Sequence, residues 1–139
     1  MKSSVISRFS LFFAILFLFL LIVIRMFTVH EDPYAWQLGV DLPVVYSPVI
    51  KLDDDAFIVS GSQTHVGEEN TIQYTLLEKG SFGFYHPVET VTVKGDQSYF
   101  VHKFTNMTPR SDVRIKIENF SRCLCRGKIM FKDITADKK

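Results

Sequence analysis

The chain has 139 residues, of which 47% are hydrophobic, and a formal net charge of +1. This near-neutral balance argues against a nucleic-acid-binding role, which typically needs a strongly basic chain. The sequence contains no P-loop, nucleophile elbow, HExxH or loop of paired carboxylates, so we predict that the protein is not an enzyme. Residues 33–139 suit a single domain with one core.

The first feature along the chain is the uncharged apolar run 9–24. It continues past Arg25 to residue 29, which is long enough to cross a bilayer core of about 30 Å if the arginine head reaches the interface. A cleaved signal peptide is the alternative, but bulky residues at 24–27 do not suit a signal peptidase. We therefore predict a transmembrane signal anchor over Phe9–Val29, in contact with the lipid bilayer.

The charges around this run indicate its orientation. Lys2 and Arg8 precede it, whereas Glu31 and Asp32 follow it. Positively charged flanks stay on the cytoplasmic side. We therefore predict that residues 1–8 form a short cytoplasmic tail and that the C-terminal domain is extracytoplasmic, whether periplasmic, extracellular or lumenal.

Residues 30–43 are expected to form a juxtamembrane connector. Pro33 and Pro43 make a long helix there improbable. Trp36 has two open interpretations: its ring lies at the headgroup level of the membrane, or it belongs to the core of the domain.

From residue 44 onwards, short apolar segments alternate with turn signals, and no segment has a helical period. This pattern predicts an all-β sandwich of jelly-roll type with about eight strands over residues 44–139. Residues 61–70 and 121–127 are expected to be loops. The expected strands are 44–50, 56–60, 71–77, 82–86, 88–94, 98–104, 112–120 and 128–135.

Charge is distributed unevenly along the domain. Residues 31–100 contain eleven acidic and three basic residues, whereas residues 101–139 contain four acidic and ten basic residues. The favoured interpretation is that the two parts interleave and that opposite charges pair across the sheets. The alternative is a basic surface for an anionic ligand or for lipid headgroups.

The last third of the domain resembles a known family. Between Val93 and Ala136 a turn, an aromatic strand, an alternating strand and a glycine-containing loop lead to a closing strand, Phe131-Lys132-Asp133-Ile134. This order is similar to the C-terminal half of jelly-roll carbohydrate-binding modules of the galactose-binding-like type. The resemblance implies a jelly-roll fold, and a glycan ligand that stacks on exposed aromatic side chains.

The candidate ligand-binding residues are Tyr85, Tyr99 and Trp36. Aromatic rings can stack on sugar rings, although most aromatic residues of a small sandwich are needed to fill its core. Tyr85 and Tyr99 are the better candidates for exposure, because a phenol oxygen can remain in water.

The resemblance also suggests a structural calcium ion as the sole cofactor. Its candidate ligands are Asp53, Asp55 and Asp133, since carboxylate oxygens are preferred calcium ligands. The simpler interpretation of the acidic run at 53–55 is a turn between two strands. A zinc site formed by His65, His86 and His102 is the less favoured metal alternative, because their spacing matches no zinc motif.

Cys123 and Cys125 form a C-x-C pair. Unpaired thiols are the first interpretation and a disulfide is the second, because residues two apart on a regular strand lie too far apart for a relaxed S–S bond. A metal site is the third, since no further cysteine motif exists.

These observations lead to one main functional hypothesis and one alternative. The main hypothesis is a membrane-anchored, extracytoplasmic binding module for a glycan or another envelope polymer. The alternative is a non-catalytic accessory or assembly subunit of a membrane protein complex.

Overall fold

The structure is a computed structural model that describes residues 13–20, 33–67, 70–121 and 123–133, the last residue by its backbone alone. The chain divides into two compact units, Met1–Glu31 and Asp32–Lys139. In the first unit, residues 13–20 are helical. Among the described residues, no helix combines the length and the apolar character that crossing a membrane requires. Most of the predicted anchor over 9–29 lies outside the described residues.

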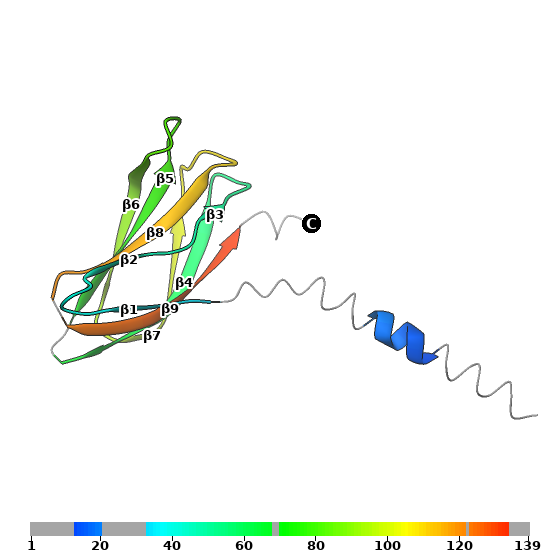
Figure 1. The fold of residues 1–139 in the computed structure, drawn as a ribbon, viewed down its shortest axis with the longest axis horizontal. Helices are drawn as coiled ribbons and strands as arrows, with labels where there is room; N and C mark the ends of the chain where they lie inside the picture. The colour runs from blue at the N-terminus through cyan, green and yellow to red at the C-terminus, as the bar shows by residue number, and fades with distance from the viewer. Residues whose placement is uncertain (1–12, 21–32, 68–69, 122, 134–139) are drawn as a thin grey trace, which may run out of the picture. The chain divides into compact units, whose positions relative to one another are not determined.

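The second unit is a sandwich of two antiparallel sheets (Figure 1). The first sheet has the strand order β1-β9-β4-β7, and the second has the order β2-β8-β5-β6, with β3 also pairing with β8. The strands are β1 (Tyr34–Leu38), β2 (Val44–Tyr46), β3 (Ile50–Lys51), β4 (Phe57–Val66), β5 (Thr71–Lys79), β6 (Tyr85–Lys94), β7 (Gln97–Phe104), β8 (Asp112–Asn119) and β9 (Leu124–Asp133).

Alternating burial along the strands creates one core between the sheets. On β8, every second residue from Val113 to Asn119 is buried, and the residues between them are partly exposed. Side chains of successive strand residues point to opposite faces, so this alternation places one face of each sheet inside and the other in solvent. The largest buried side chains are Tyr74, Phe57, Phe104, Leu38, Ile72, Leu76, Ile115, Ile117 and Ile129.

The expected all-β sandwich is confirmed, and the described residues form nine strands. The strands differ in extent from the prediction. The predicted strand 44–50 is divided into β2 and β3 around Ser47, which is buried and whose Oγ accepts a hydrogen bond from the Ile115 N–H at 2.9 Å. The two segments on either side of Pro87 form the single strand β6, because a register shift between Leu76 and Leu77 on β5 accommodates the proline.

Three segments that the sequence indicated as connector or loop are strands. β1 lies in the predicted connector, and its Trp36 is only 4% exposed, which favours the core interpretation of this residue. β4 continues to Val66, and β9 begins at Leu124. All three belong to the first sheet, where β9 lies between β1 and β4. The first sheet, which was only partly predicted, therefore has the less regular alternation of apolar and polar residues.

Candidate functional site

Three hollows lie on the solvent-facing side of the first sheet, here called the outer face. The middle hollow has a volume of about 500 Å³ and lies over β1, β9 and β4. Its sides are formed by two rows of side chains that the strand register places next to one another. One row is Ala35, Lys128 and Ser62, and the other is Gln37, Arg126 and Thr64.

The other two hollows adjoin the middle one. The hollow next to Tyr99, the Tyr99 hollow, shares Ser62 and Lys128 with the middle hollow. The hollow next to His65, the His65 hollow, shares Thr64 and Arg126 with it. Their volumes are about 240 and 250 Å³. The three hollows therefore form one line along β9, with Lys128 and Arg126 among the residues shared by neighbouring hollows.

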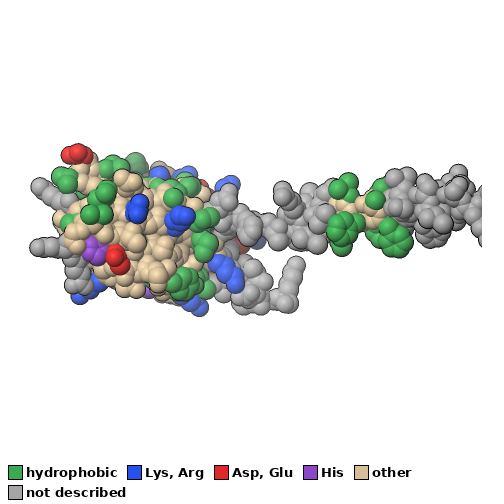
Figure 2. All heavy atoms as spheres, turned by 90° about the horizontal axis from the view of Figure 1, so that it is seen from below, with side chains coloured by type: hydrophobic (Ala, Val, Ile, Leu, Met, Phe, Trp, Pro, Cys, Tyr) green, Lys and Arg blue, Asp and Glu red, His purple; other side chains and the backbone are tan. Residues whose placement is uncertain are grey.

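Side chains with hydroxyl and amide groups surround this line of hollows. Ser62, Thr64 and Gln37 supply hydroxyl and amide groups, and no aspartate or glutamate is among the described residues that line the three hollows. Apolar surface is added by Tyr99, which is 64% exposed, and by Met130, which is 44% exposed. Figure 2 views the molecule from the side on which β1, β9 and β7 lie in Figure 1, and it shows Lys and Arg side chains in the middle of that side.

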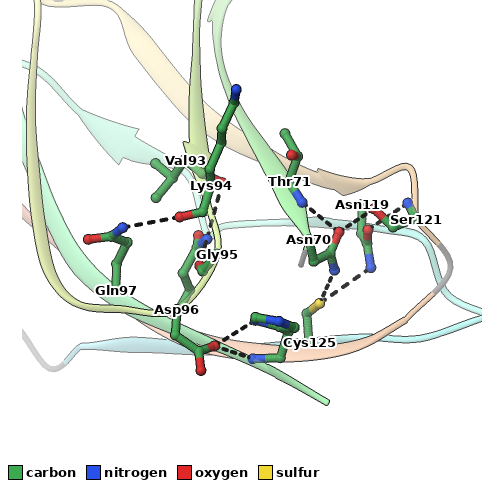
Figure 3. A network of polar contacts seen from close by, with 12 residues as sticks. Asn70, Thr71, Val93, Lys94, Gly95, Asp96, Gln97, Asn119, Ser121 and Cys125 are labelled. Atoms are coloured by element: carbon green, nitrogen blue, oxygen red, sulfur yellow. Dashed lines mark hydrogen bonds and ion pairs between the residues drawn. The ribbon is translucent and has the colours of Figure 1, made fainter. Parts of the chain in front are cut away.

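The end of β4 that carries the hollows is held by the turn between β6 and β7 (Figure 3). Gln63 is buried and donates hydrogen bonds from Nε2 to the carbonyl oxygens of Val93, at 3.2 Å, and Gly95, at 2.7 Å. The backbone N–H of His65 donates to Asp96 Oδ1 at 2.8 Å, and His65 Nδ1 lies 2.7 Å from the same oxygen. These bonds from His65 lower the pKa of Asp96, so this carboxylate remains ionised and paired.

The predicted ligand-binding aromatic residues do not form one site. Tyr99 projects from β7 beside the line of hollows. Tyr85 lies on β6 in the second sheet, where its ring and that of Tyr46 each lie 5.4 Å from the guanidinium carbon of Arg114. Trp36 is part of the core, with its ring edge-on to that of Tyr74 at 6.0 Å. Only Tyr99 therefore combines exposure with a neighbouring hollow.

The candidate calcium ligands lie at the start and the end of the first sheet's central strands. Asp53 and Asp55 lie between β3 and β4, and the carbonyl oxygen of Asp55 accepts a hydrogen bond from the Met107 N–H at 3.0 Å. Asp133 is paired by its backbone with Phe57, and its side chain is outside the described part. In the described part of the chain, no three His, Cys, Asp or Glu residues are grouped to hold a metal ion. The calcium ion stays a prediction.

The histidines do not converge as the zinc alternative requires. Each contacts a different carboxylate: His65 contacts Asp96, His102 contacts Glu89 at 2.8 Å, and His86 lies 3.8 Å from Glu78. These pairs occur at separate places in the sandwich, which explains the absence of any histidine motif in the sequence.

Both cysteines are free thiols, so the disulfide between Cys123 and Cys125 is not formed in the structure. Cys125 is buried on β9, and its Sγ accepts hydrogen bonds from the side-chain amides of Asn70 and Asn119 (Figure 3). Cys123 lies at the entry to this strand, and its thiol is directed to the Ser121 carbonyl oxygen at 3.5 Å. Both thiols therefore have polar partners other than each other.

The residues that shape the hollows were missing from the sequence-based candidates. Ser62, Thr64 and Arg126 lie in segments that were expected to be loops, and Lys128 was expected to begin the last strand. The available signal was the spacing of the basic residues at 126 and 128, which share a face if the segment is a strand. Gly127 between them made a strand appear improbable.

Comparison with known proteins finds similarity among solved structures alone. No protein-family model matches the chain, and no curated protein matches it. Among solved structures, the chain is similar to the CBM22-1 xylan-binding domain from Paenibacillus barcinonensis Xyn10C, with a TM-score of 0.41 and 12% sequence identity. The match covers 71% of this chain and 64% of that domain. The resemblance to carbohydrate-binding modules noted in the sequence is thus matched by a structure of that kind. A structural similarity this low says nothing about the ligand of this chain.

Proposed function

We propose that this chain is a non-catalytic binding module for a glycan or a similar envelope polymer, and that the ligand lies along β9 on the outer face. The observation that carries the proposal is the single line of three connected hollows. From Leu124 to Met130, which border its ends, the line extends roughly 20 Å at about 3.3 Å per residue. A linear polymer can occupy such a line with several of its units.

The lining chemistry suits a ligand rich in hydroxyl groups. Ser62, Thr64 and Gln37 offer both donors and acceptors from the rigid strands β4 and β1. A few polar groups in fixed positions, combined with one apolar surface, are typical of small-ligand sites. The exposed ring of Tyr99 supplies that apolar surface, on which the face of a sugar ring can stack.

The test is affinity electrophoresis of the full-length chain through gels that contain neutral or charged linear polysaccharides, with the chain solubilised in a non-ionic detergent. In a second step, Ser62→Trp fills the boundary of two hollows without entering the core, because Ser62 faces outwards. Thr92→Trp on β6 is the matched control, since Thr92 also faces outwards from a strand. Retardation that only Ser62→Trp abolishes supports the proposal, and equal retardation of both variants contradicts it.

The proposal includes anchoring of the module by Phe9–Val29, with the N-terminus in the cytoplasm and the sandwich outside it. Its support is the apolar run and the basic residues Lys2 and Arg8 before it. Extraction of membranes with alkaline carbonate tests the anchoring, and protease treatment of intact cells or vesicles tests the side on which the sandwich lies. Release of the protein from the membrane into the carbonate supernatant would contradict the predicted anchor.

One observation favours the alternative function as an accessory subunit. Phe82 and Phe84, in the turn between β5 and β6, are 92% and 80% exposed. Two such side chains on one turn are a candidate contact for a protein partner. Photo-crosslinking from position 82 in the membrane of origin tests this alternative, with position 92 on β6 as the control site. A specific crosslinked protein at position 82 alone would favour it.

A further inference from the structure

We infer that the line of hollows selects an anionic glycan, whose carboxylate groups are bound by Arg126 and Lys128. This inference rests on the proposed function and adds the chemical class of the ligand. The two residues are the boundaries between neighbouring hollows, so any polymer lying along β9 must pass both of them. Both side chains are exposed and lie on the outer face.

Among the described residues of the outer face, no negative charge offsets these two cations. Their neighbours across the strands are Ala35 and Ser62 for Lys128, and Gln37 and Thr64 for Arg126. Within the described ranges, no acidic side chain forms an ion pair with either.

The same face carries two further basic residues near the other end of β9. Lys103 on β7 and Lys132 on β9 both pair by register with Ile58 on β4. The described outward residues of the four strands include no aspartate or glutamate. The described outward residues of β9 therefore give the outer face a positive character.

The second sheet shows the opposite arrangement. On its solvent-facing side Lys116 pairs with Glu118 at 2.7 Å, and Lys79 pairs with Asp112 at 3.5 Å. Arg114 lies against the rings of two tyrosines. These basic side chains of the second sheet thus have acidic or aromatic partners, whereas Arg126 and Lys128 on the outer face have no ion-pair partner among the described residues.

A described acidic residue near the line, Asp96, is already paired. Its carboxylate accepts a hydrogen bond from the backbone N–H of His65 and contacts the ring of the same residue, which lines the His65 hollow.

The spacing and the type of the two cations favour carboxylate groups on a glycan. Arg126 and Lys128 are two residues apart on one strand, so their Cα atoms are separated by roughly 6.6 Å. A guanidinium binds a carboxylate through two parallel hydrogen bonds, and an ammonium adds a second point of charge. Single-stranded nucleic acid would need several exposed, stacking aromatic rings as well. Among the described residues that line the hollows, Tyr99 is exposed, whereas Trp36 is buried in the core.

The test compares two polymers that differ only in charge. Polygalacturonate and the same polymer after reduction of its carboxyl groups are titrated into the full-length chain in detergent, and binding is measured by affinity electrophoresis. The double variant Arg126→Gln, Lys128→Gln removes both cations. The double variant Lys51→Gln, Lys94→Gln is the control, because it removes the same charge from exposed positions on the second sheet.

We expect the chain to bind polygalacturonate at least about tenfold more tightly than the reduced polymer, with a loss of similar size in Arg126→Gln, Lys128→Gln alone. Equal binding of both polymers, unaffected by that variant, would overturn the inference and leave the proposed function standing. Absence of binding to any polysaccharide by the folded chain would overturn both. Tighter binding of poly(dA) than of polygalacturonate, lost in the same variant, would overturn the inference in favour of nucleic acid.

Discussion

The indole ring of Trp36 occupies the space that a side chain at Gly127 would need. A Cβ atom placed on Gly127 would lie 2.5 Å from Cζ2 of Trp36 and 2.4 Å from the carbonyl oxygen of Ser62. The two residues are partners in the register of β1 and β9, and Gly127 lies between Arg126 and Lys128. Because Gly127 has no side chain, the indole ring of Trp36 can pack against β9 directly beneath the middle hollow.

We therefore predict that Gly127→Ala destabilises the sandwich by about 1–3 kcal/mol, because the added methyl group has no space and the backbone or the indole must move. Chemical denaturation followed by Trp36 fluorescence measures this loss. Gly39→Ala is the matched control, since a Cβ there meets no atom within 4 Å. A stability equal to that of Gly39→Ala would show that the indole is not held against β9.

This relationship also explains which part of the fold the sequence could predict. The second sheet has regular alternation, as in β8, where Val113, Ile115 and Ile117 face the core, and its strands from residue 71 onwards were predicted well. In the first sheet the inward positions hold Gln63 and Gly127, whose roles depend on partners distant in the sequence. Gln63 forms hydrogen bonds to the turn between β6 and β7, and Gly127 leaves space for the indole of Trp36. In the sequence alone, both residues look like loop residues.

The candidate site was missed for the same reason. Ser62 and Thr64 line the hollows because β4 continues past Gly61, and Arg126 and Lys128 share a face because β9 begins at Leu124. Neither extension has an apolar alternation of its own. Tyr99 is exposed, as expected of a phenol that can remain in water, whereas Tyr85, expected to be exposed for the same reason, is partly buried.

Tyr74→Phe is expected to cost about 1–3 kcal/mol of stability. The Tyr74 hydroxyl is fully buried and donates to Gln63 Oε1 at 2.9 Å, while burial raises the pKa of the phenol, so that it remains a neutral donor. Without it, the buried amide oxygen of Gln63 loses its donor. Tyr34→Phe, which removes an exposed bond to the Tyr46 carbonyl oxygen, should cost much less in the same urea titration. Equal losses would contradict the role of the buried bond.

The two thiols are expected to differ in reactivity. Cys125 is 1% exposed, and burial, followed by the nearby Cys123 and Asp96, raises the pKa of its thiol, although the bond from Asn70 acts in the opposite direction. Only the thiolate reacts with iodoacetamide, so Cys123 should be alkylated in the folded protein at pH 8 and Cys125 only after denaturation. Peptide mass mapping distinguishes the two sites. Alkylation of both at equal rates in the native state would contradict this assignment.

Glu78→Gln should reduce stability at neutral pH and have little effect in acid. Glu78 ends β5, and its Oε1 accepts the Thr108 N–H at 2.8 Å, which ties the loop before β8 to the second sheet. Burial alone would raise the pKa of this carboxyl, but the hydrogen bonds from Thr108 and Ser111 and the nearby His86 outweigh burial and lower the pKa below its ordinary value of 4.5.

A lowered pKa in the folded state means that the carboxylate stabilises the fold above pH 4.5, and that this contribution is lost as the pH falls through the folded value. The wild type should therefore exceed Glu78→Gln by about 1–2 kcal/mol at pH 7, and the difference should shrink as the pH is lowered past 4.5. Thermal unfolding between pH 2 and pH 7 measures it. Glu118→Gln, which removes a partly exposed ion pair to Lys116, is the control and should cost under about 1 kcal/mol. A difference between wild type and Glu78→Gln that stays constant with pH would show that the ionised carboxylate is not what holds the loop.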